Sequence, residues 1–183
     1  MSAAGPTTRV IRFEDMPRQR WRNGGGWTRE LLAWPAQDDW RVRVSVADIE
    51  SDGPFSAFPG VRRFFAVLDG AGVELTIDGR SQQVTRGDDA VTFSGEAATS
   101  CRLIAGPTRD LNLMVRDAEG AMQRASAGQV WQPVARACGL FATATGHCRA
   151  GEHATALPAY ALLWFEAAPA ALAFDASGWW LAA

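Results

Sequence analysis

Apolar and polar residues alternate most regularly in the segment from residue 40 to residue 49. The even positions from 42 to 46 are all valine, and the odd positions from 41 to 45 carry Arg41, Arg43 and Ser45. A side-chain period of two is that of a β-strand and does not fit an α-helix. We therefore predict a strand over residues 40–49 with one polar and one apolar face.

Short apolar runs of the same kind recur along the chain, separated by turn-forming residues at intervals of about eight to twelve positions. Asn23-Gly24 predicts a hairpin turn, because both residues accept a positive φ at low cost, and Asp78-Gly79 predicts another. The other predicted strands cover residues 9–13, 63–68, 73–77, 81–85, 90–93, 99–104, 111–116, 130–134, 140–145, 159–165, 171–174 and 179–181.

Two segments lack a strand pattern. Residues 117–128 are small and polar, which predicts a linker or a short helix, and residues 146–155 predict a loop. Many short strands with frequent turns indicate an all-β sandwich or barrel. We place a first barrel in residues 1–116 and a second, smaller half in residues 117–183. A barrel as small as the second half would be marginally stable alone, so we expect the two halves to pack as one body.

Composition and charge exclude several classes of protein. The 183 residues are 48% hydrophobic and 21% charged, which is an ordinary globular balance. The net charge of −2 provides no attraction to phosphate backbones, so we expect no nucleic-acid partner. All 18 basic residues are arginine, and the absence of lysine excludes Schiff-base chemistry on a lysine amine.

Targeting signals and disulfides are not expected. Residues 1–9 contain no apolar h-region of the kind found in a secretory signal. The longest apolar stretch, residues 156–165, is much shorter than the ~20 residues that span a bilayer. Three scattered cysteines do not form a disulfide framework. We expect a cytoplasmic protein that has no membrane partner.

Ordered motifs over residues 10–116 resemble those of the HutD/Ves family of bacterial proteins. The resemblance implies two packed antiparallel cupin barrels, a bicupin with little helix. It also implies a cytoplasmic protein linked in some bacteria to histidine utilisation, with a proposed role in sensing or buffering a metabolite such as N-formylglutamate. The family carries no firmly assigned enzymatic activity. The motifs are Trp21-Arg-Asn-Gly-Gly-Gly-Trp-Thr-Arg-Glu30, Arg43-Val-Ser-Val-Ala47, Asp52-Gly-Pro-Phe-Ser56, Phe58-Pro-Gly-Val-Arg-Arg63, Leu68-Asp-Gly-Ala-Gly72, Phe93-Ser-Gly95 and Gly106-Pro-Thr-Arg-Asp-Leu-Asn-Leu-Met114.

Metal and nucleophile chemistry find no support in the sequence. Residues 1–146 contain no histidine, so the first barrel lacks the histidine ligands of a metal-dependent cupin. His147, Cys148 and His153 fit no zinc-ligand spacing, and we interpret the histidines as surface residues. The serines of the first half have no histidine base, and no Gly-x-Ser-x-Gly elbow occurs. We expect no metal and no cofactor.

A set of polar residues at a period of two is the remaining candidate site. Arg43 and Ser45 share one strand face, and Asp110, Asn112 and Met114 share another. An arginine on an inward face would pair with a carboxylate while serine and asparagine orient it. Trp21 or Trp27 would line the pocket wall, and most other tryptophans would pack in the core. The candidate ligand-binding residues are Asn23, Glu30, Arg43, Ser45, Arg63, Asp110, Asn112 and Met114.

Alternation alone does not decide which face points inward. In one alternative the arginines lie on an outer, solvated face, and in another a buried arginine–carboxylate pair only stabilises the barrel. The family resemblance favours a pocket.

Three functional hypotheses follow, and the sequence favours the first. The first is a metal-independent protein that binds a small carboxylate such as N-formylglutamate or formate. The second is a metal-free isomerase, lyase or deformylase with Glu30 or Asp110 as the base. The third is a stress-related oligomer, for example a homodimer, in which Trp179-Trp180 supplies an apolar interface and Met114 and phenylalanines fill the barrel.

Overall fold

The computed structural model describes residues 7–183, and residues 1–6 of the N-terminal segment considered for a signal lie outside this range. The prediction of an all-β chain is confirmed. Between residues 7 and 183 the one helical element is a 3-10 turn, η1 (Phe13–Asp15), and the rest of the regular structure is strand. No helix in this range is long and apolar enough to cross a bilayer.

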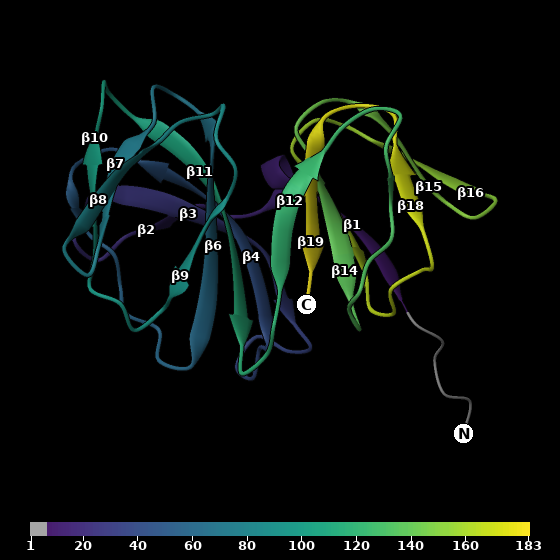
Figure 1. Cartoon of the computed structure of the whole chain (residues 1–183), viewed down its shortest axis with the longest axis horizontal. Coiled ribbons are helices and arrows are strands. Elements are labelled where there is room, and N and C mark those ends of the chain that lie inside the picture. The colour runs from purple at the N-terminus through teal and green to yellow at the C-terminus, as the bar shows by residue number, and fades with distance from the viewer. Residues whose placement is uncertain (1–6) are drawn as a thin grey trace. The chain divides into compact units, whose positions relative to one another are not determined.

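The strands belong to two compact units. The central unit is Met16–Glu119, and the terminal unit combines the described residues up to Asp15 with Gly120–Ala183. Figure 1 shows each unit as strands that curve around an interior of its own.

The central unit consists of two antiparallel sheets. Its apolar core joins both sheets and includes Phe65, Val67, Val73 and Leu75. The larger sheet has the strand order β2 (Gln19–Arg20), β3 (Gly26–Trp34), β4 (Val42–Ile49), β11 (Thr108–Arg116), β6 (Val61–Asp69) and β9 (Val91–Ser94). The smaller sheet has the order β5 (Gly53–Pro54), β10 (Thr99–Leu103), β7 (Val73–Ile77) and β8 (Arg80–Val84).

The terminal unit also has two antiparallel sheets around an apolar core, which includes Leu140, Leu163, Phe174 and Trp180. One sheet has the order β1 (Thr8–Arg12), β17 (Ala161–Phe165), β14 (Cys138–Ala142), β19 (Gly178–Ala182) and β12 (Ala121–Ala125). The other has the order β13 (Val130–Trp131), β18 (Leu172–Phe174), β15 (Gly146–Ala150) and β16 (His153–Leu157).

The sequence predicted one boundary, after residue 116, whereas the central unit begins at Met16 and ends at Glu119. β1 was expected in the first barrel, but it pairs with β17 over its whole length and belongs to the terminal unit. The strand with which a segment pairs determines the sheet to which it belongs, and the sequence of residues 8–12 alone does not identify that partner strand.

Two segments predicted without strands are strands. β12 lies within the expected linker, where Met122 and Ala125 are buried and the small residues between them hide the pattern. β15 and β16 form a hairpin in the expected loop, with Gly151 at a φ of 59° in the turn. The prediction that the C-terminal tryptophans supply an apolar interface is wrong, because Trp179 and Trp180 are both buried.

Candidate functional site

Three adjacent strands of the central unit align polar side chains across one face of the larger sheet. On the middle strand, β11, Met114 lies opposite Arg43 of β4 and Arg63 of β6. Two residues earlier, Asn112 lies opposite Ser45 of β4. Because directly opposed residues of antiparallel strands share a face, these side chains gather on one side of the sheet.

The same face becomes apolar further along the strands. Asp110 of β11 lies opposite Ala47 of β4 and Val67 of β6, across a register shift between residues 109 and 110. Phe65 and Ile49 then join the buried apolar core of the unit. Asp110 is therefore a carboxyl group at the border between a polar surface and a hydrocarbon core.

A cavity of about 460 Å³ opens on the polar part of this face. The volume lies within the ~300–1,000 Å³ range of small-molecule sites. We call it the arginine cavity. It is lined by Gln19, Arg20, Trp21, Arg22, Asn23, Thr28, Arg43, Ser45, Ala47, Pro54, Phe55, Ser56, Phe58, Arg63, Asp110, Asn112 and Met114.

The guanidinium of Arg63 is held in an aromatic cage inside this cavity. Its central carbon lies 5.1 Å from the ring centroid of Phe55, 5.6 Å from that of Phe58 and 5.1 Å from that of Phe93. Such contacts attract a cation electrostatically. Nη1 donates a 3.3 Å hydrogen bond to the carbonyl oxygen of Ser56. Only 5% of the residue is exposed, and burial lowers its pKa to about 10, so it remains charged at neutral pH.

A hydrogen-bonded chain connects Arg63 to Asp110 through Asn112. Arg63 Nη2 donates to Asn112 Oδ1 at 3.3 Å, and Asn112 Nδ2 donates in turn to Asp110 Oδ1. Asp110 is 1% exposed, and its Oδ2 atom is buried with no hydrogen-bond partner among the residues described. Desolvation raises the pKa of Asp110 to about 8, although the positive charge of Arg63 opposes the rise.

Arg43, the second arginine of the face, is paired with Glu30. Its Nε donates to Glu30 Oε2, and the other carboxylate oxygen accepts a 2.6 Å hydrogen bond from Gln37. Glu30 does not line the cavity, so its place is beside the site rather than in it. Nε is the one Arg43 nitrogen with a hydrogen-bond partner within the described chain, which leaves the two terminal nitrogens for a ligand.

The glycine hairpin between β2 and β3 contributes one wall. Trp21 lines the cavity and donates from Nε1 to Thr28 Oγ1 at 2.7 Å, whereas Trp27 is not a lining residue. The side chain of Asn23 is engaged within the turn, where Oδ1 accepts a 3.0 Å hydrogen bond from the Gly25 backbone nitrogen. Asn23 therefore shapes the wall with its amide oxygen already used.

The structure thus brings all the predicted binding residues except Glu30 to the wall of one cavity. The polar face of β4 lines the cavity, and the valines lie on the opposite face, where all three are buried. The aromatic cage of Phe55, Phe58 and Phe93 was not among the residues predicted from the sequence. Each of the three lies in one of the family motifs, Asp52–Ser56, Phe58–Arg63 and Phe93–Gly95, and this is the signal that the sequence offered for them.

Metal-ligand clusters are not present in the described chain: across residues 7–183, no group of three or more His, Cys, Asp or Glu side chains could hold a metal ion. His147 and His153 are exposed, which confirms their interpretation as surface residues, whereas Cys148 between them is buried. His147 pairs with Asp175, whose Oδ2 lies 3.4 Å from Nδ1.

Comparison with known proteins identifies relatives among the HutD and Ves proteins. The sequence profile of the HutD family matches residues 13–182. An uncharacterized 21.2 kDa protein in the hutC 3′ region of Pseudomonas putida is 42% identical over 107 residues, 57% of this chain and 56% of its own. Protein Ves of Cronobacter sakazakii is 37% identical over 55% of this chain and 56% of its own. The aligned part spans about half the length of these relatives.

Solved structures resemble the whole chain. HutD from Pseudomonas fluorescens SBW25, solved in a formate condition, has a TM-score of 0.85 at 27% identity, covering 96% of this chain and 97% of its own. A cupin 2 conserved barrel domain protein from Leptotrichia buccalis has a TM-score of 0.57 at 10% identity and covers 94% of each chain. The second likeness concerns the fold alone and identifies it as cupin-like.

Proposed function

The chain belongs to the HutD family, and from that premise together with the arginine cavity we propose that it is a metal-independent binding protein for a small carboxylate. Candidate ligands are formate and N-formylglutamate, and the proposed setting is the sensing of a metabolite during histidine utilisation. The neighbouring gene region of the Pseudomonas putida relative and the formate condition of the Pseudomonas fluorescens structure are in keeping with these candidates.

The buried guanidinium of Arg63 carries the proposal. A buried charge without a counter-ion is costly, and none of the ion pairs within residues 7–183 includes Arg63. Its Nε is also buried, and no group within residues 7–183 accepts a hydrogen bond from it. A carboxylate in the cavity would supply the missing negative charge beside a guanidinium, the group that pairs most favourably with carboxylates.

Arg43 and Ser45 extend the binding surface next to Arg63. The terminal nitrogens of Arg43 are available, while its Nε is held by Glu30 and its orientation is therefore constrained. A second anionic group on a longer ligand such as N-formylglutamate would pair with Arg43. The hypothesis of a barrel filled by Met114 and phenylalanines is less well supported, since about 460 Å³ of the interior is open.

Calorimetric titration and thermal-shift measurements with formate, N-formylglutamate, glutamate and urocanate test the proposal. A ligand that binds only the folded protein raises its stability in proportion to the logarithm of its concentration. Replacing Arg63 by Met should weaken binding of an active carboxylate at least about tenfold, because a charge-assisted hydrogen bond is lost. Absence of any melting shift at millimolar concentrations of all four compounds would contradict the proposal.

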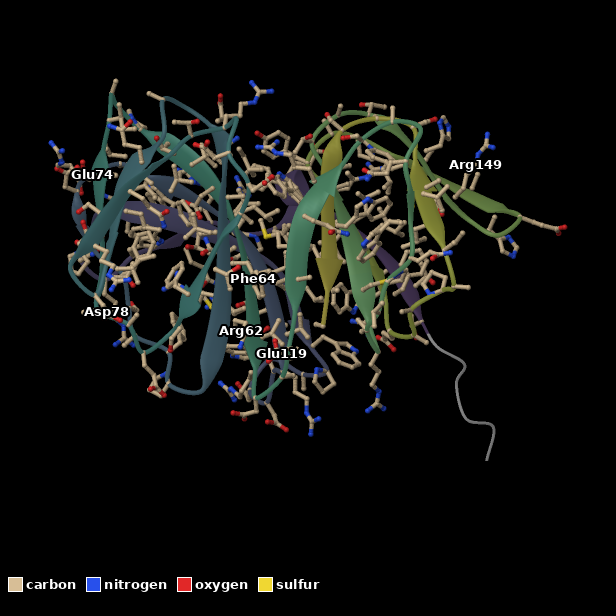
Figure 2. All side chains as sticks on the ribbon, in the orientation of Figure 1. Arg62, Phe64, Glu74, Asp78, Glu119 and Arg149 are labelled. Atoms are coloured by element: carbon tan, nitrogen blue, oxygen red, sulfur yellow. The ribbon has the colours of Figure 1, made fainter. Side chains whose placement is uncertain are left out.

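Arg62 provides the matched control. It is the sequence neighbour of Arg63 but is exposed and pairs at 3.0 Å with Glu119, and Figure 2 labels both side chains. Arg62→Met removes the same charge without touching the cavity and should leave the affinity unchanged. An equal loss of affinity in both variants would indicate a general effect of protein charge rather than a binding site at Arg63.

A metal-free enzyme is the second candidate, and one observation favours it. Asp110 is a cavity carboxyl whose pKa is raised to about 8 beside an arginine, which is an arrangement used for proton transfer at neutral pH. Proton exchange on candidate acids, followed by NMR in deuterated buffer at pH 7, tests this candidate. No exchange above the rate in buffer would exclude it, and Asp110→Asn should abolish any exchange that is seen.

A further inference from the structure

The carboxyl group of Asp110 has one oxygen that no part of the described chain satisfies. Oδ1 accepts from Asn112, whereas Oδ2 is buried and has no partner. Buried polar atoms without a partner are rare in folded proteins, and each one needs a specific explanation. Asp110 lines the arginine cavity, so a ligand bound in that cavity would lie next to this residue.

The arginine next to Asn112 determines which oxygen of Asp110 is left over. A guanidinium only donates, so Asn112 must present its amide oxygen to Arg63 at 3.3 Å. Its NH₂ group then necessarily faces Asp110 and occupies Oδ1 as a donor. When the carboxyl group is protonated, the proton therefore resides on Oδ2, where it can be donated.

The charged groups around Asp110 are few. Arg63 of β6 favours ionisation, Asp48 of β4 opposes it, and the thiol of Cys101 on β10 is buried nearby with a pKa raised to about 12. Asp110 forms no ion pair within residues 7–183. Desolvation is the largest influence and raises the pKa of Asp110 to about 8, which favours the acid form.

We propose that protonated Asp110 is a ligand-selecting residue that donates a hydrogen bond from Oδ2 to an oxygen acceptor of the bound carboxylate, while Arg63 supplies the positive charge. This inference rests on the proposed function. The cavity then selects anions that have a second acceptor oxygen for Asp110, in addition to the oxygen that pairs with Arg63. When Asp110 ionises, its negative charge repels the ligand and its donor is lost, so the carboxylate is released.

The pH dependence of binding tests the inference. Dissociation constants for formate and for N-formylglutamate are measured by calorimetry between pH 6 and pH 9.5. Affinity should fall by about tenfold per pH unit above the pKa of Asp110, because the ligand binds only one protonation state. Near pH 8, binding should take up a proton, which is measured as a dependence of the binding enthalpy on the buffer's ionisation enthalpy.

Three variants separate Asp110 from other titrating groups. Asp110→Asn keeps a donor that does not titrate, so it should bind with an affinity that is independent of pH. Asp110→Leu has no donor and should bind about tenfold more weakly at pH 6.5. Asp48→Asn removes the nearby carboxylate on β4, which pairs with Arg109 at 2.6 Å, and should retain the fall in affinity at high pH.

The protonation of the ligand-free protein provides an independent measurement. A difference infrared spectrum of wild type against Asp110→Asn should contain a protonated carboxyl band at pH 6.5, and its absence overturns the inference whatever binds. A dissociation constant that is flat with pH overturns the inference but leaves the proposed function standing. Absence of any carboxylate binding at every pH overturns both.

Discussion

At the scale of single residues, the arrangement around Arg63 depends on three neighbours of different chemistry. Aromatic rings surround the cation, an amide occupies one of its terminal nitrogens, and the amide connects it to a buried carboxyl group. No ion pair neutralises the guanidinium in the described chain. A structural arginine–carboxylate pair would place the guanidinium and the carboxyl group in direct contact, whereas here Asn112 lies between them and hydrogen-bonds to both.

The buried carboxyl of Asp110 should give the stability of the folded protein a particular pH dependence. Its pKa rises from 3.8 to about 8 on folding, so between these values the folded state holds the proton more tightly than the unfolded state. Its contribution to stability is therefore present below about pH 4 and is lost as pH rises through about 8. Asp110→Asn removes this contribution.

Melting temperatures measured from pH 5 to pH 9 test this dependence. The difference between Asp110→Asn and wild type should shift steadily in favour of the variant as pH increases, because only wild type must then bury a carboxylate. A difference that is constant with pH would show that Asp110 titrates near its ordinary value in the folded state.

Residue alternation predicted which side chains share a face but not where that face points. The strict period of two of a strand correctly put Arg43 and Ser45 on one face of β4, and Asp110, Asn112 and Met114 on one face of β11, but the pairing of the two strands came from the structure. The inward direction depends on how the sheet closes, which local sequence does not encode. The aromatic cage was beyond prediction for the same reason, since Phe93 approaches Arg63 from the strand β9, some thirty positions later in the chain.

At the scale of elements, the hairpin between β2 and β3 depends on glycine for close backbone contact. A Cβ atom on Gly26 would lie 2.4 Å from the carbonyl oxygen of Asp48, a backbone atom of the adjacent strand β4. Real Cβ contacts are not that short, so the two strands would have to separate. The paired strands both line the arginine cavity: β3 contributes Thr28, and β4 contributes Arg43, Ser45 and Ala47.

Replacing Gly26 by Ala should therefore destabilise the protein by about 1–3 kcal/mol, as expected for overpacking at a rigid contact. Gly87→Ala is the control, because the nearest atom to its Cβ is Thr85 Oγ1 at 3.8 Å, an ordinary contact. The control should change stability by less than about 0.5 kcal/mol. Urea unfolding of both variants measures the difference, and equal stabilities would contradict the assigned backbone contact.

The strands that the sequence pattern did not predict share one physical property: they bury little side-chain volume. β12 exposes Ala121 and Gln123 and buries Met122, so its pattern is too weak to identify a strand. β15 and β16 alternate correctly but carry mostly small residues, and Cys148 is the one side chain of β15 in the core. Pairing with neighbouring strands, rather than local propensity, determines such segments.

At the scale of the whole molecule, the chain passes from the terminal unit into the central unit and back again. β1 pairs in register with β17 from Thr8 opposite Phe165 to Arg12 opposite Ala161, so the two ends of the sequence build one sheet. The central unit is in contrast one continuous segment, and every residue of the arginine cavity lies within it. The arginine cavity and the long-range pairing of the chain ends are therefore formed by separate parts of the sequence.

Removal of residues 1–12 should expose the β17 edge without removing any cavity residue. β17 would lose one of its two neighbours, β1, and keep β14. Amide hydrogen exchange measured by mass spectrometry should accelerate in Ala161–Phe165, because those backbone groups lose their partners, and an unpaired edge also favours association between chains. The truncated protein should still bind a carboxylate that the full chain binds, since Arg43, Arg63 and Asn112 remain. Unchanged exchange in β17 would contradict the pairing of the two chain ends, and it would return residues 8–12 to the first barrel, where the sequence pattern alone had placed them.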